Sequence, residues 1–358
     1  MSVDAGTLRT QPGDILFNNT NSLKWVGKTA LITSDQPMGF SNHMTRLRPR
    51  PSVDAAFLAI QLHFLQQSGF FESVASNHVN QASIATRQLA RVEVVVPPLD
   101  EQRRIVAILE DHLSHIDCAQ RALDATIRRC SVMTKQVLLR LVPGQESYPE
   151  SWESTTVGKA GLVELGRQRH PDWHVGSNMK PYLRVANVFE DRLALEDVME
   201  MHWPDDTFRR FRLQPGDVLL NEGQSPHLLG RPAIYRGDPP EVAFTNSLLR
   251  FRAHPGVLPE FSLLVFRRHM HAGRFIEESR ITTNIAHLSA SRLKAVEFPV
   301  PPLAEQKAII ETARETFRMV DAARNSVVAV NRHLAALRRS LLAAVFRGDL
   351  TRDFRKEG

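Results

Sequence analysis

The sequence predicts an α+β protein in which two tandem domains of mixed α/β structure are separated by two long helices that form a coiled coil. Three observations predict this architecture. A stretch of sequence recurs about 203 residues further along the chain, a long segment without glycine or proline follows each copy, and apolar residues recur every seven positions within those segments. The 358 residues suffice for two or three domains that each bury a core.

Short motifs that return in the same order carry the repeat. Arg9–Leu16 reads RTQPGDIL and returns at Arg212–Leu219 as RLQPGDVL, and Val96–Gln102, VPPLDEQ, returns at Val300–Gln306 as VPPLAEQ. A repeat of this length indicates a duplicated domain, because solenoid units span only about 20–50 residues. Residues 148–203 have no counterpart in the first copy. We therefore expect an incomplete first copy, either truncated or completed by another polypeptide, unless it functions without the segment.

Each copy shows a similar order of predicted elements before its Pro-Pro pair. β-Branched residues bounded by prolines predict a strand just ahead of that pair. In the first domain, residues 1–97, the expected elements are strands at 14–18, 29–33 and 92–96 and a helix at 55–67. In the second domain, residues 145–300, they are a helix at 258–271 and a strand at 296–300.

A long helix is expected after each Pro-Pro pair, at 98–144 and 301–350, and residues 351–358 form a tail. Proline is tolerated in a first helical turn, and neither Leu99–Leu141 nor Leu303–Phe346 contains glycine or proline. The heptad spacing favours a coiled coil over an ordinary amphipathic helix, and each helix is the natural partner of the other. The apolar heptad positions are Leu109, Ile116, Leu123, Cys130 and Val137 in the first, and Ala313, Val320, Val327, Leu334 and Leu341 in the second.

The composition is that of a basic globular protein. The net charge is +6 and the pI about 9.6, a balance that suits phosphate recognition although many basic proteins bind no nucleic acid. No run of 18 apolar residues and no secretory signal is present, so no membrane association is expected. Two cysteines in a helical stretch suggest thiols and not a disulfide, and the expected location is the cytoplasm.

The sequence shows no convincing catalytic constellation. The nearest match to a methyltransferase motif, Asp238–Glu241, ends in a glutamate that cannot stack on a flipped base, and it reads as a turn. A Walker A motif and a nuclease-like carboxylate cluster are both lacking. His269 and His271 alternate beside two arginines and are expected on a solvated polar face, not as metal ligands.

Polar loops at equivalent places in the two copies suggest a surface that reads DNA. Turn chemistry explains any one of these residues, but as a set they favour base readout because their identities differ while their flanks stay alike. The candidate DNA-binding residues are Asn18, Asn19, Asn21, Lys24, Asn77, Asn80 and Gln81 in the first copy, and Arg184, Asn187, Asn221, Gln224, Ser225, Arg280, Thr282, Thr283 and Asn284 in the second.

Two runs of alternating arginines could add phosphate contacts. Arg46, Arg48 and Arg50 alternate in the first copy, and Arg250 and Arg252 alternate in the second. Alternation along a strand places such side chains on one face. Phosphate contact is a reasonable expectation, and a solvated strand face is nearly as good an explanation.

Together these features resemble the specificity subunit of a type I DNA restriction-modification enzyme. The resemblance rests on the tandem duplication, the QPGD segments, the paired VPPLxEQ helix starts and the ending Leu341–Leu350, LLAAVFRGDL. In that family two target-recognition domains each read one half of a split DNA sequence, and two long antiparallel helices separate these domains. The resemblance makes residues 1–97 an incomplete first recognition domain, 98–144 and 301–350 the spacer helices, and 145–300 the second recognition domain.

The resemblance implies a recognition subunit without catalytic residues of its own. Its partners would be double-stranded DNA, two methyltransferase subunits that methylate adenine at N6, and restriction subunits that cleave. No cofactor is expected on this chain, since S-adenosylmethionine, ATP and Mg would lie on the partner subunits. The alternatives are a specificity subunit of a related DNA-modification system, a coiled-coil scaffold that binds protein, and, least favoured, an enzyme.

Overall fold

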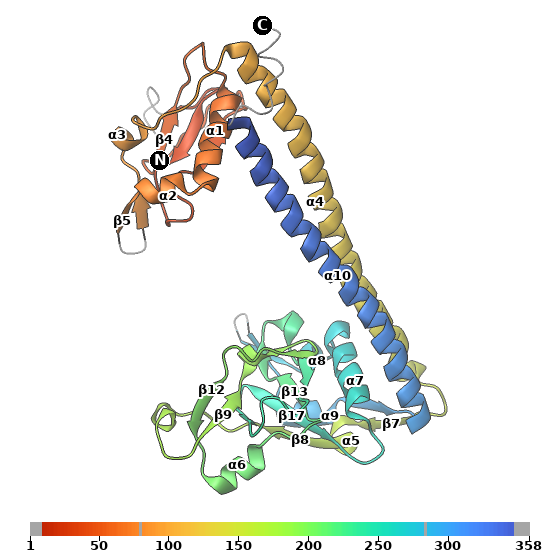
Figure 1. The fold of residues 1–358 in the computed structure, drawn as a ribbon. Coiled ribbons are helices and arrows are strands. Elements are labelled where there is room, and N and C mark those ends of the chain that lie inside the picture. The colour runs from red at the N-terminus through yellow and green to blue at the C-terminus, as the bar shows by residue number, and fades with distance from the viewer. Residues whose placement is uncertain (1–8, 79–80, 283–284, 347–358) are drawn as a thin grey trace. The chain divides into compact units, whose positions relative to one another are not determined.

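The computed structural model of the chain forms two compact units, each described here by itself. The first unit comprises residues 1–126 and 326–358, and the second comprises residues 127–325 (Figure 1). Within these units the structure describes residues 9–78, 81–282 and 285–346. Among the described residues, no helix combines the length and the apolarity that crossing a bilayer requires.

The first unit contains two small antiparallel sheets packed with short helices. Strand order is β3-β1-β4 in one sheet and β2-β6-β5 in the other. The strands are β1 (Ile15–Asn18), β2 (Thr20–Asn21), β3 (Thr29–Leu31), β4 (Met44–Leu47), β5 (Ser76–His78) and β6 (Gln81–Ser83), and the helices are α1 (Ala55–Gln67), α2 (Phe70–Val74) and α3 (Thr86–Leu89). Phe17 and Phe71 are fully buried at the centre and meet edge to face.

The second unit is larger and adds several strands to the same plan. Its main sheet has the order β15-β13-β17-β8, and further sheets are β12-β9-β16, β14-β19-β18, β20-β7 and β10-β11. The strands are β7 (Glu153–Thr156), β8 (Gly161–Leu165), β9 (Met179–Leu183), β10 (Val188–Phe189), β11 (Arg192–Leu193), β12 (Met199–His202), β13 (Val218–Asn221), β14 (Gly223–Gln224), β15 (Pro232–Ile234), β16 (Ala243–Phe244), β17 (Leu248–Ala253), β18 (Arg280–Thr282), β19 (Ile285–His287) and β20 (Glu297–Val300). The helices are α5 (Val157–Ala160), α6 (Asp205–Phe211), α7 (Pro259–Ala272), α8 (Arg274–Glu277) and α9 (Ala290–Ala295).

The strand registers confirm that the chain contains one fold twice. Ile15 of β1 pairs with Leu31 on one side and Leu47 on the other. At the equivalent place, Val218 of β13 pairs with Ile234 and Phe251. The small sheets agree as well, because β2-β6-β5 and β14-β19-β18 have the same order and equivalent partners.

The QPGD motif forms the same turn in both copies. The Asp14 carboxylate accepts a hydrogen bond from the backbone N of Gln11 at 2.9 Å and pairs with Arg48 at 2.7 and 2.9 Å. The Asp217 carboxylate likewise accepts from the backbone N of Gln214 at 2.8 Å and pairs with Arg252 at 2.6 and 2.7 Å. The glycine of each motif has a positive φ, 88° and 96°, which explains its identity.

The two long helices are confirmed. Helix α4 spans Leu99–Leu141 and α10 spans Leu303–Phe346, 43 and 44 residues. Within the first unit, Leu109 near the start of α4 packs in one cluster with Leu342 near the end of α10. Within the second unit, Leu138 near the end of α4 packs with Ile309 near the start of α10. Pairing the start of each helix with the end of the other makes the two antiparallel.

The glutamine of each VPPLxEQ motif fastens its helix to the domain before it. Gln102 accepts from the backbone N of Asp54 at 2.8 Å and donates to the carbonyls of Ser52 and Pro97 at 3.1 and 2.7 Å. Gln306 makes the equivalent three hydrogen bonds at 2.8–2.9 Å. Both glutamines are fully buried, so the motif is explained by a structural role.

One predicted strand is wrong. Residues 92–96 form no strand, whereas their equivalents form β20. Strand β20 pairs with β7, which belongs to the stretch 148–203 that has no counterpart in the first copy. A strand requires a neighbour for its backbone hydrogen bonds, and local β-propensity does not supply one.

Candidate nucleic-acid interface

The candidate loops of each copy converge on one small sheet. In the first unit Asn21 of β2 pairs with Ala82 of β6, and Gln81 pairs with His78 across the β5–β6 hairpin. In the second unit Gln224 of β14 pairs with Ala286 of β19. Loops about 60 residues apart in sequence therefore lie side by side, as base readout by a common surface requires.

Several first-copy candidates present polar side chains at this sheet. Lys24, Asn77 and Gln81 are exposed. The amides of Asn18 and Asn21 each accept a hydrogen bond from a nearby backbone N, at 3.3 and 2.8 Å, and their amide nitrogens form no hydrogen bond with the described residues. Asn19 is more engaged, because its amide contacts Thr20 and Thr45 at 3.4 Å.

An exposed tryptophan beside these loops was missed by the sequence interpretation. Trp25 is 43% exposed, and the ammonium groups of Lys24 and Lys28 lie 5.2 and 4.0 Å from the centre of its ring. Two cations on an aromatic face suit contact with phosphates and bases. The spacing of an aromatic residue between two lysines was the available signal.

Two second-copy candidates are buried and do not meet the expectation of base contact. Asn187 is 1% exposed, and its amide closes a turn by accepting from the Arg184 backbone N at 3.0 Å and donating to two carbonyls. Asn221 is fully buried on β13, and its amide forms no hydrogen bond within the part of the chain that the structure describes. Strand β13 is covered on both sides, which a loop-like sequence pattern does not reveal.

The remaining second-copy candidates differ in how far they are free. Arg184 pairs with Asp197, and the Gln224 amide oxygen accepts from the backbone N of Ser225 at 3.1 Å. The backbone of Arg280 and Thr282 belongs to β18, which pairs with β19. Asn80, Thr283 and Asn284 lie outside the described residues.

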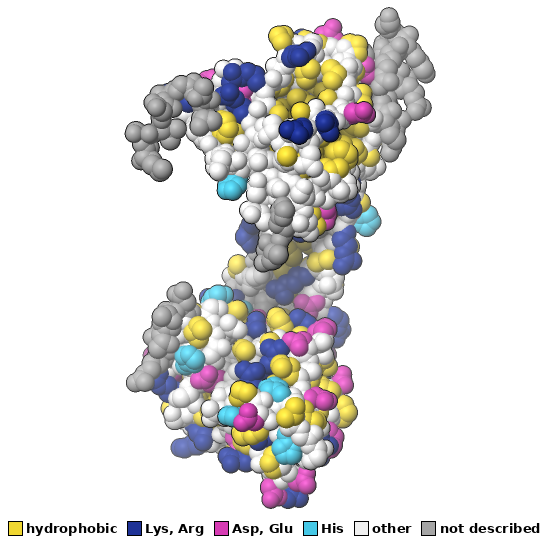
Figure 2. All heavy atoms as spheres, turned by 90° about the vertical axis from the view of Figure 1, so that its left-hand side faces the viewer, with side chains coloured by type: hydrophobic (Ala, Val, Ile, Leu, Met, Phe, Trp, Pro, Cys, Tyr) yellow, Lys and Arg dark blue, Asp and Glu magenta, His cyan; other side chains and the backbone are white. Residues whose placement is uncertain are grey.

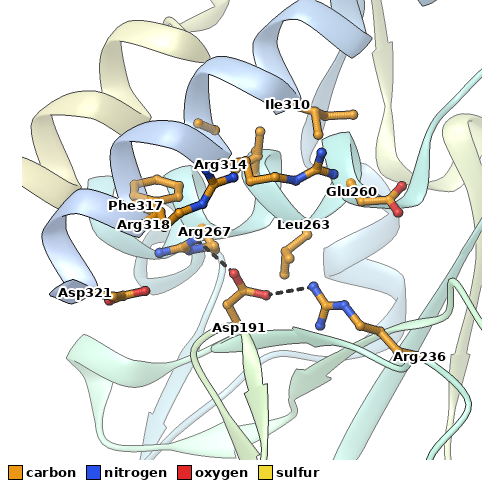
Figure 3. Close-up of a pocket in the computed structure, with 12 residues that line it drawn as sticks. Asp191, Arg236, Glu260, Leu263, Arg267, Ile310, Arg314, Phe317, Arg318 and Asp321 are labelled. Carbon is orange, nitrogen blue, oxygen red and sulfur yellow. Dashed lines mark hydrogen bonds and ion pairs between the residues drawn. The ribbon is translucent and has the colours of Figure 1, made fainter. Parts of the chain in front are cut away.

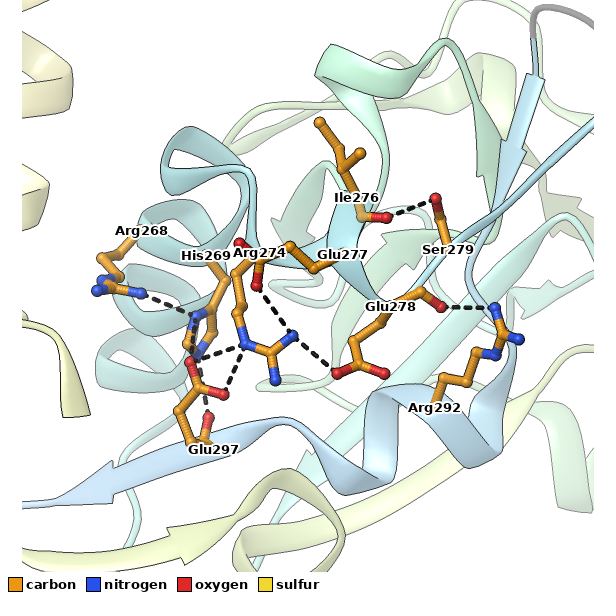
Figure 4. Close-up of polar contacts among 9 residues, drawn as sticks. All are labelled: Arg268, His269, Arg274, Ile276, Glu277, Glu278, Ser279, Arg292 and Glu297. Carbon is orange, nitrogen blue, oxygen red and sulfur yellow. Dashed lines mark hydrogen bonds and ion pairs between the residues drawn. The ribbon is translucent and has the colours of Figure 1, made fainter. Parts of the chain in front are cut away.

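A polar network holds the base of the β18–β19 hairpin (Figure 4). Arg274 of α8 pairs with Glu297 of β20 at 2.9 Å and with Glu278 at 2.8 Å. Arg292 of α9 donates to the carbonyl of Glu278 at 2.7 Å. The network thus ties two helices and a strand to the segment that leads into β18, which fixes where the hairpin begins.

His269 belongs to this network and not to a solvated face. The side chain is 1% exposed, its Nε2 lies 3.0 Å from the carbonyl oxygen of Glu297, and Arg268 lies 3.3 Å from its Nδ1. Burial lowers the pKa of His269 to about 3, and nearby Arg268 adds to this, so the ring is neutral. The expectation of a solvated histidine fails here because the alternation His-x-His falls on a helix with one buried side.

The alternating arginines are mostly structural. Arg48 and Arg252 are held by Asp14 and Asp217. Arg250 is 2% exposed and pairs with Glu164 at 2.6 Å. Burial speaks against phosphate contact for Arg250, whereas phosphate contact stays a prediction for Arg48 and Arg252, whose side chains are 46% and 31% exposed.

A pocket of about 300 Å³ lies between α7 and α10 in the second unit (Figure 3). Arg267 reaches across it to Glu190 at 2.8 Å and Asp191 at 3.3 Å, and its guanidinium lies 4.3 Å from the ring centre of Phe317. Asp191 also pairs with Arg236 at 3.4 Å. These contacts tie helix α10 to α7 and to the loop that carries Glu190 and Asp191.

Within the described ranges, no group of three His, Cys, Asp or Glu side chains is placed to hold a metal.

These features define a class of protein: a duplicated α+β module in which each copy offers a small polar sheet and continues into a long helix. Residues 5–128 match the family model of the type I restriction modification DNA specificity domain. The chain is 23% identical over 365 residues to the StySPI specificity subunit of Salmonella potsdam, covering 98% of this chain and 77% of that one. It is 23% identical over 325 residues to the putative MjaX specificity subunit of Methanocaldococcus jannaschii, covering 86% and 72%.

Solved structures share the fold. A chain from a study of complex assembly and conformational transition of the type I R-M system superposes with a TM-score of 0.77 at 17% identity, covering 96% of this chain and 85% of that chain. The HsdS subunit from Thermoanaerobacter tengcongensis gives a TM-score of 0.54 at 18% identity, covering 96% and 84%. Residues 5–128 thus match a type I DNA specificity domain, and nearly the whole chain is similar in sequence and fold to type I specificity subunits.

Proposed function

We propose that this chain is the sequence-specific DNA-binding subunit of a type I restriction-modification complex, in which it recognises a bipartite site and docks methyltransferase and restriction subunits. Each copy would read one half of the site, and the paired helices would set the separation of the halves. Catalysis, with S-adenosylmethionine, ATP and Mg, would belong to the partner subunits.

The observation that carries this proposal is the pair of equivalent small sheets with unlike side chains. The β5–β6 and β18–β19 hairpins share one register, yet Asn77 stands where the second copy has Ile281, and Gln81 stands where it has Ile285. Side chains that differ on a common backbone frame suit two domains that read different base sequences.

The experiment begins by defining the target. Methylome sequencing of the host with and without this gene should reveal one split motif that depends on the gene. The double variant N77A/Q81A should then relax one half of the motif, at a cost of about 1–3 kcal/mol per lost base contact, and leave the other half unchanged. The matched control is Gln36→Ala, an exposed amide in the same unit. Equal relaxation of both halves would contradict the proposed division of labour.

Electrophoretic shift separates this function from a protein-binding scaffold. With the partner methyltransferase present and at stated salt, the complex should prefer the mapped site over a scrambled duplex. Purified partner-free chain should transfer no labelled methyl group from S-adenosylmethionine. Methyl transfer by the chain alone, or a shift without preference for the site, would overturn the proposal.

A further inference from the structure

The first unit has an apolar groove of about 180 Å³ bordered by β4, α1 and α3. Strand β4 is the last strand of its sheet, so one of its edges has no neighbouring strand among the described residues. Val95 and Val96, just past the groove, are 63% and 46% exposed. The groove is lined by Thr45, Leu47, Leu58, Leu62, Thr86, Leu89, Ala90, Val92 and Val94.

The second copy shows what covers this surface. The equivalents of Leu47 and Val92 are Phe251 and Val296, and both are fully buried. Their cover is the strand–helix–strand segment β7–α5–β8. Strand β8 pairs with β17, with Val163 opposite Phe251, β7 pairs with β20, and α5 packs against α9. The groove in the first copy is thus the surface that such a segment occupies in the second.

The charges at the groove fit the same kind of occupant. In the second copy Arg250 is 2% exposed and pairs with Glu164 of β8 at 2.6 Å. Its equivalent, Arg46, donates to the carbonyl of Arg9 at 2.7 Å and forms no ion pair with a carboxylate among the described residues. An occupant that carries a glutamate at the position of Glu164 would supply the missing charge.

The backbone beside the groove is also oriented so that a further strand could pair with it. With its nitrogen turned to Val95, the Gln61 side-chain amide donates to the Val95 carbonyl at 3.1 Å and accepts from its N at 2.8 Å. Successive residues of an extended chain direct their N–H and C=O groups to opposite sides. Val94 and Val96 therefore direct theirs away from Gln61. The second copy agrees, since Val95 is replaced there by Pro299, which has no N–H, and its strand pairs with β7.

We propose that this groove binds a strand–helix–strand segment of the β7–α5–β8 type that lies outside residues 9–346, with an acidic residue directed at Arg46 and apolar residues filling the groove. The chain's own β7–α5–β8 segment is already paired with β17 and β20, so the occupant is a different segment of the same type. The inference rests on the internal repeat and does not depend on the proposed DNA-binding function.

The test uses the full chain and a fluorescent peptide with the sequence of residues 150–167. Anisotropy should show saturable binding, and hydrogen exchange should slow at residues 44–47 and 92–96. A peptide with Glu164→Lys should bind at least about tenfold more weakly, which corresponds to roughly 1.4 kcal/mol. The chain variant Arg46→Glu should restore binding of that peptide. This charge exchange keeps the result informative even if one change alone disturbs folding.

Four results would overturn the proposal. The first is no saturable binding of the peptide, and the second is binding that ignores the charge exchange. The third is protection confined to residues 248–253 and 297–300, which would mean that the peptide replaces the chain's own segment. Dimerisation of the peptide-free chain in sedimentation, with protection of residues 44–47, would place a second copy on the groove and would equally refute it.

Discussion

At the scale of single residues, the repeated motifs of this chain are structural. Asp14 and Gln102 each satisfy backbone groups that would otherwise be orphaned, and their equivalents Asp217 and Gln306 do the same. The pKa of Asp14 is lowered, chiefly by the hydrogen bond from Arg48, so its pair is kept at neutral pH. The motifs that are repeated in both copies therefore hold each copy together, whereas the loops whose residues differ between the copies form the candidate DNA-reading surface.

The buried His269 makes stability depend on pH. Its folded pKa of about 3 lies below the ordinary value of 6.5, so the unfolded chain binds the proton more readily between these values. Stability should be fully present above pH 6.5 and fall as the pH drops toward 3. His269→Gln should flatten this slope in urea unfolding between pH 7.5 and 5. The control is the exposed His254→Gln, and an unchanged slope in the His269 variant would contradict the assignment.

Each of the two buried glutamines should contribute more to the free energy of unfolding than an exposed glutamine does. Gln102→Ala or Gln306→Ala removes three hydrogen bonds and leaves buried backbone groups unpaired, so each should cost about 2–3 kcal/mol of unfolding free energy. Gln120→Ala, in the middle of α4, loses only an exposed contact with Asp124 and should change little. Denaturant unfolding measures all three, and equal effects would refute the fastening role.

At the scale of elements, the long helices follow their sequence closely, whereas the strand at 92–96 does not. Leu99–Leu141 is a helix over its whole predicted length, because its hydrogen bonds are internal to the element. The heptad residues Leu109 and Val327 are buried, at 0% and 5% exposure, as expected of a helix–helix seam. A strand depends on a neighbour, and in the first copy the described chain holds none at that place.

If the helices set the separation of the two half-sites, their length should appear in the DNA target. Deleting the equivalent heptads 120–126 and 324–330 removes about 10.5 Å of helix, at ~1.5 Å per residue. The non-specific spacer should shorten by about three base pairs, at ~3.4 Å each, with both halves unchanged. Methylome sequencing reads this directly, with Arg121→Ala as a control for change within the same heptad. An unchanged spacer would remove the helices from this role.

At the scale of the whole molecule, the two copies have equivalent strand registers, but the main sheet of the second copy is more fully covered than that of the first. The main sheet of the second copy has a fourth strand, β8, that the first copy lacks among its described residues. Met44 is 38% exposed, whereas its equivalent Leu248 is fully buried. The same fold is therefore expected to be less stable in its first occurrence, because less apolar surface is removed from water.

Hydrogen exchange should reveal this inequality in the isolated chain. Amides across residues 14–96 should exchange faster than those across residues 217–300, with the largest difference between β4 and β17, since an edge strand opens more easily than a central one. Exchange measured by mass spectrometry at neutral pH resolves the two regions. Strands β1 and β13 serve as an internal control in this experiment, because each of them lies between two neighbouring strands of its sheet. Equal protection of the two halves would show that the first copy needs no further cover.

The sequence by itself determined the duplication, the α+β class and both long helices, because repeats, heptads and helix starts depend on residues close together in the chain, whereas the antiparallel pairing of the helices is seen in their contacts. The tertiary structure decided which polar residues are free. It buried Asn187, Asn221 and His269 and paired Arg250 with Glu164, 86 residues away. The tertiary structure also shows that residues 92–96 form no strand. Burial and strand pairing depend on segments that are remote in the sequence, and no local sequence pattern specifies which segment will pack or pair with a given residue.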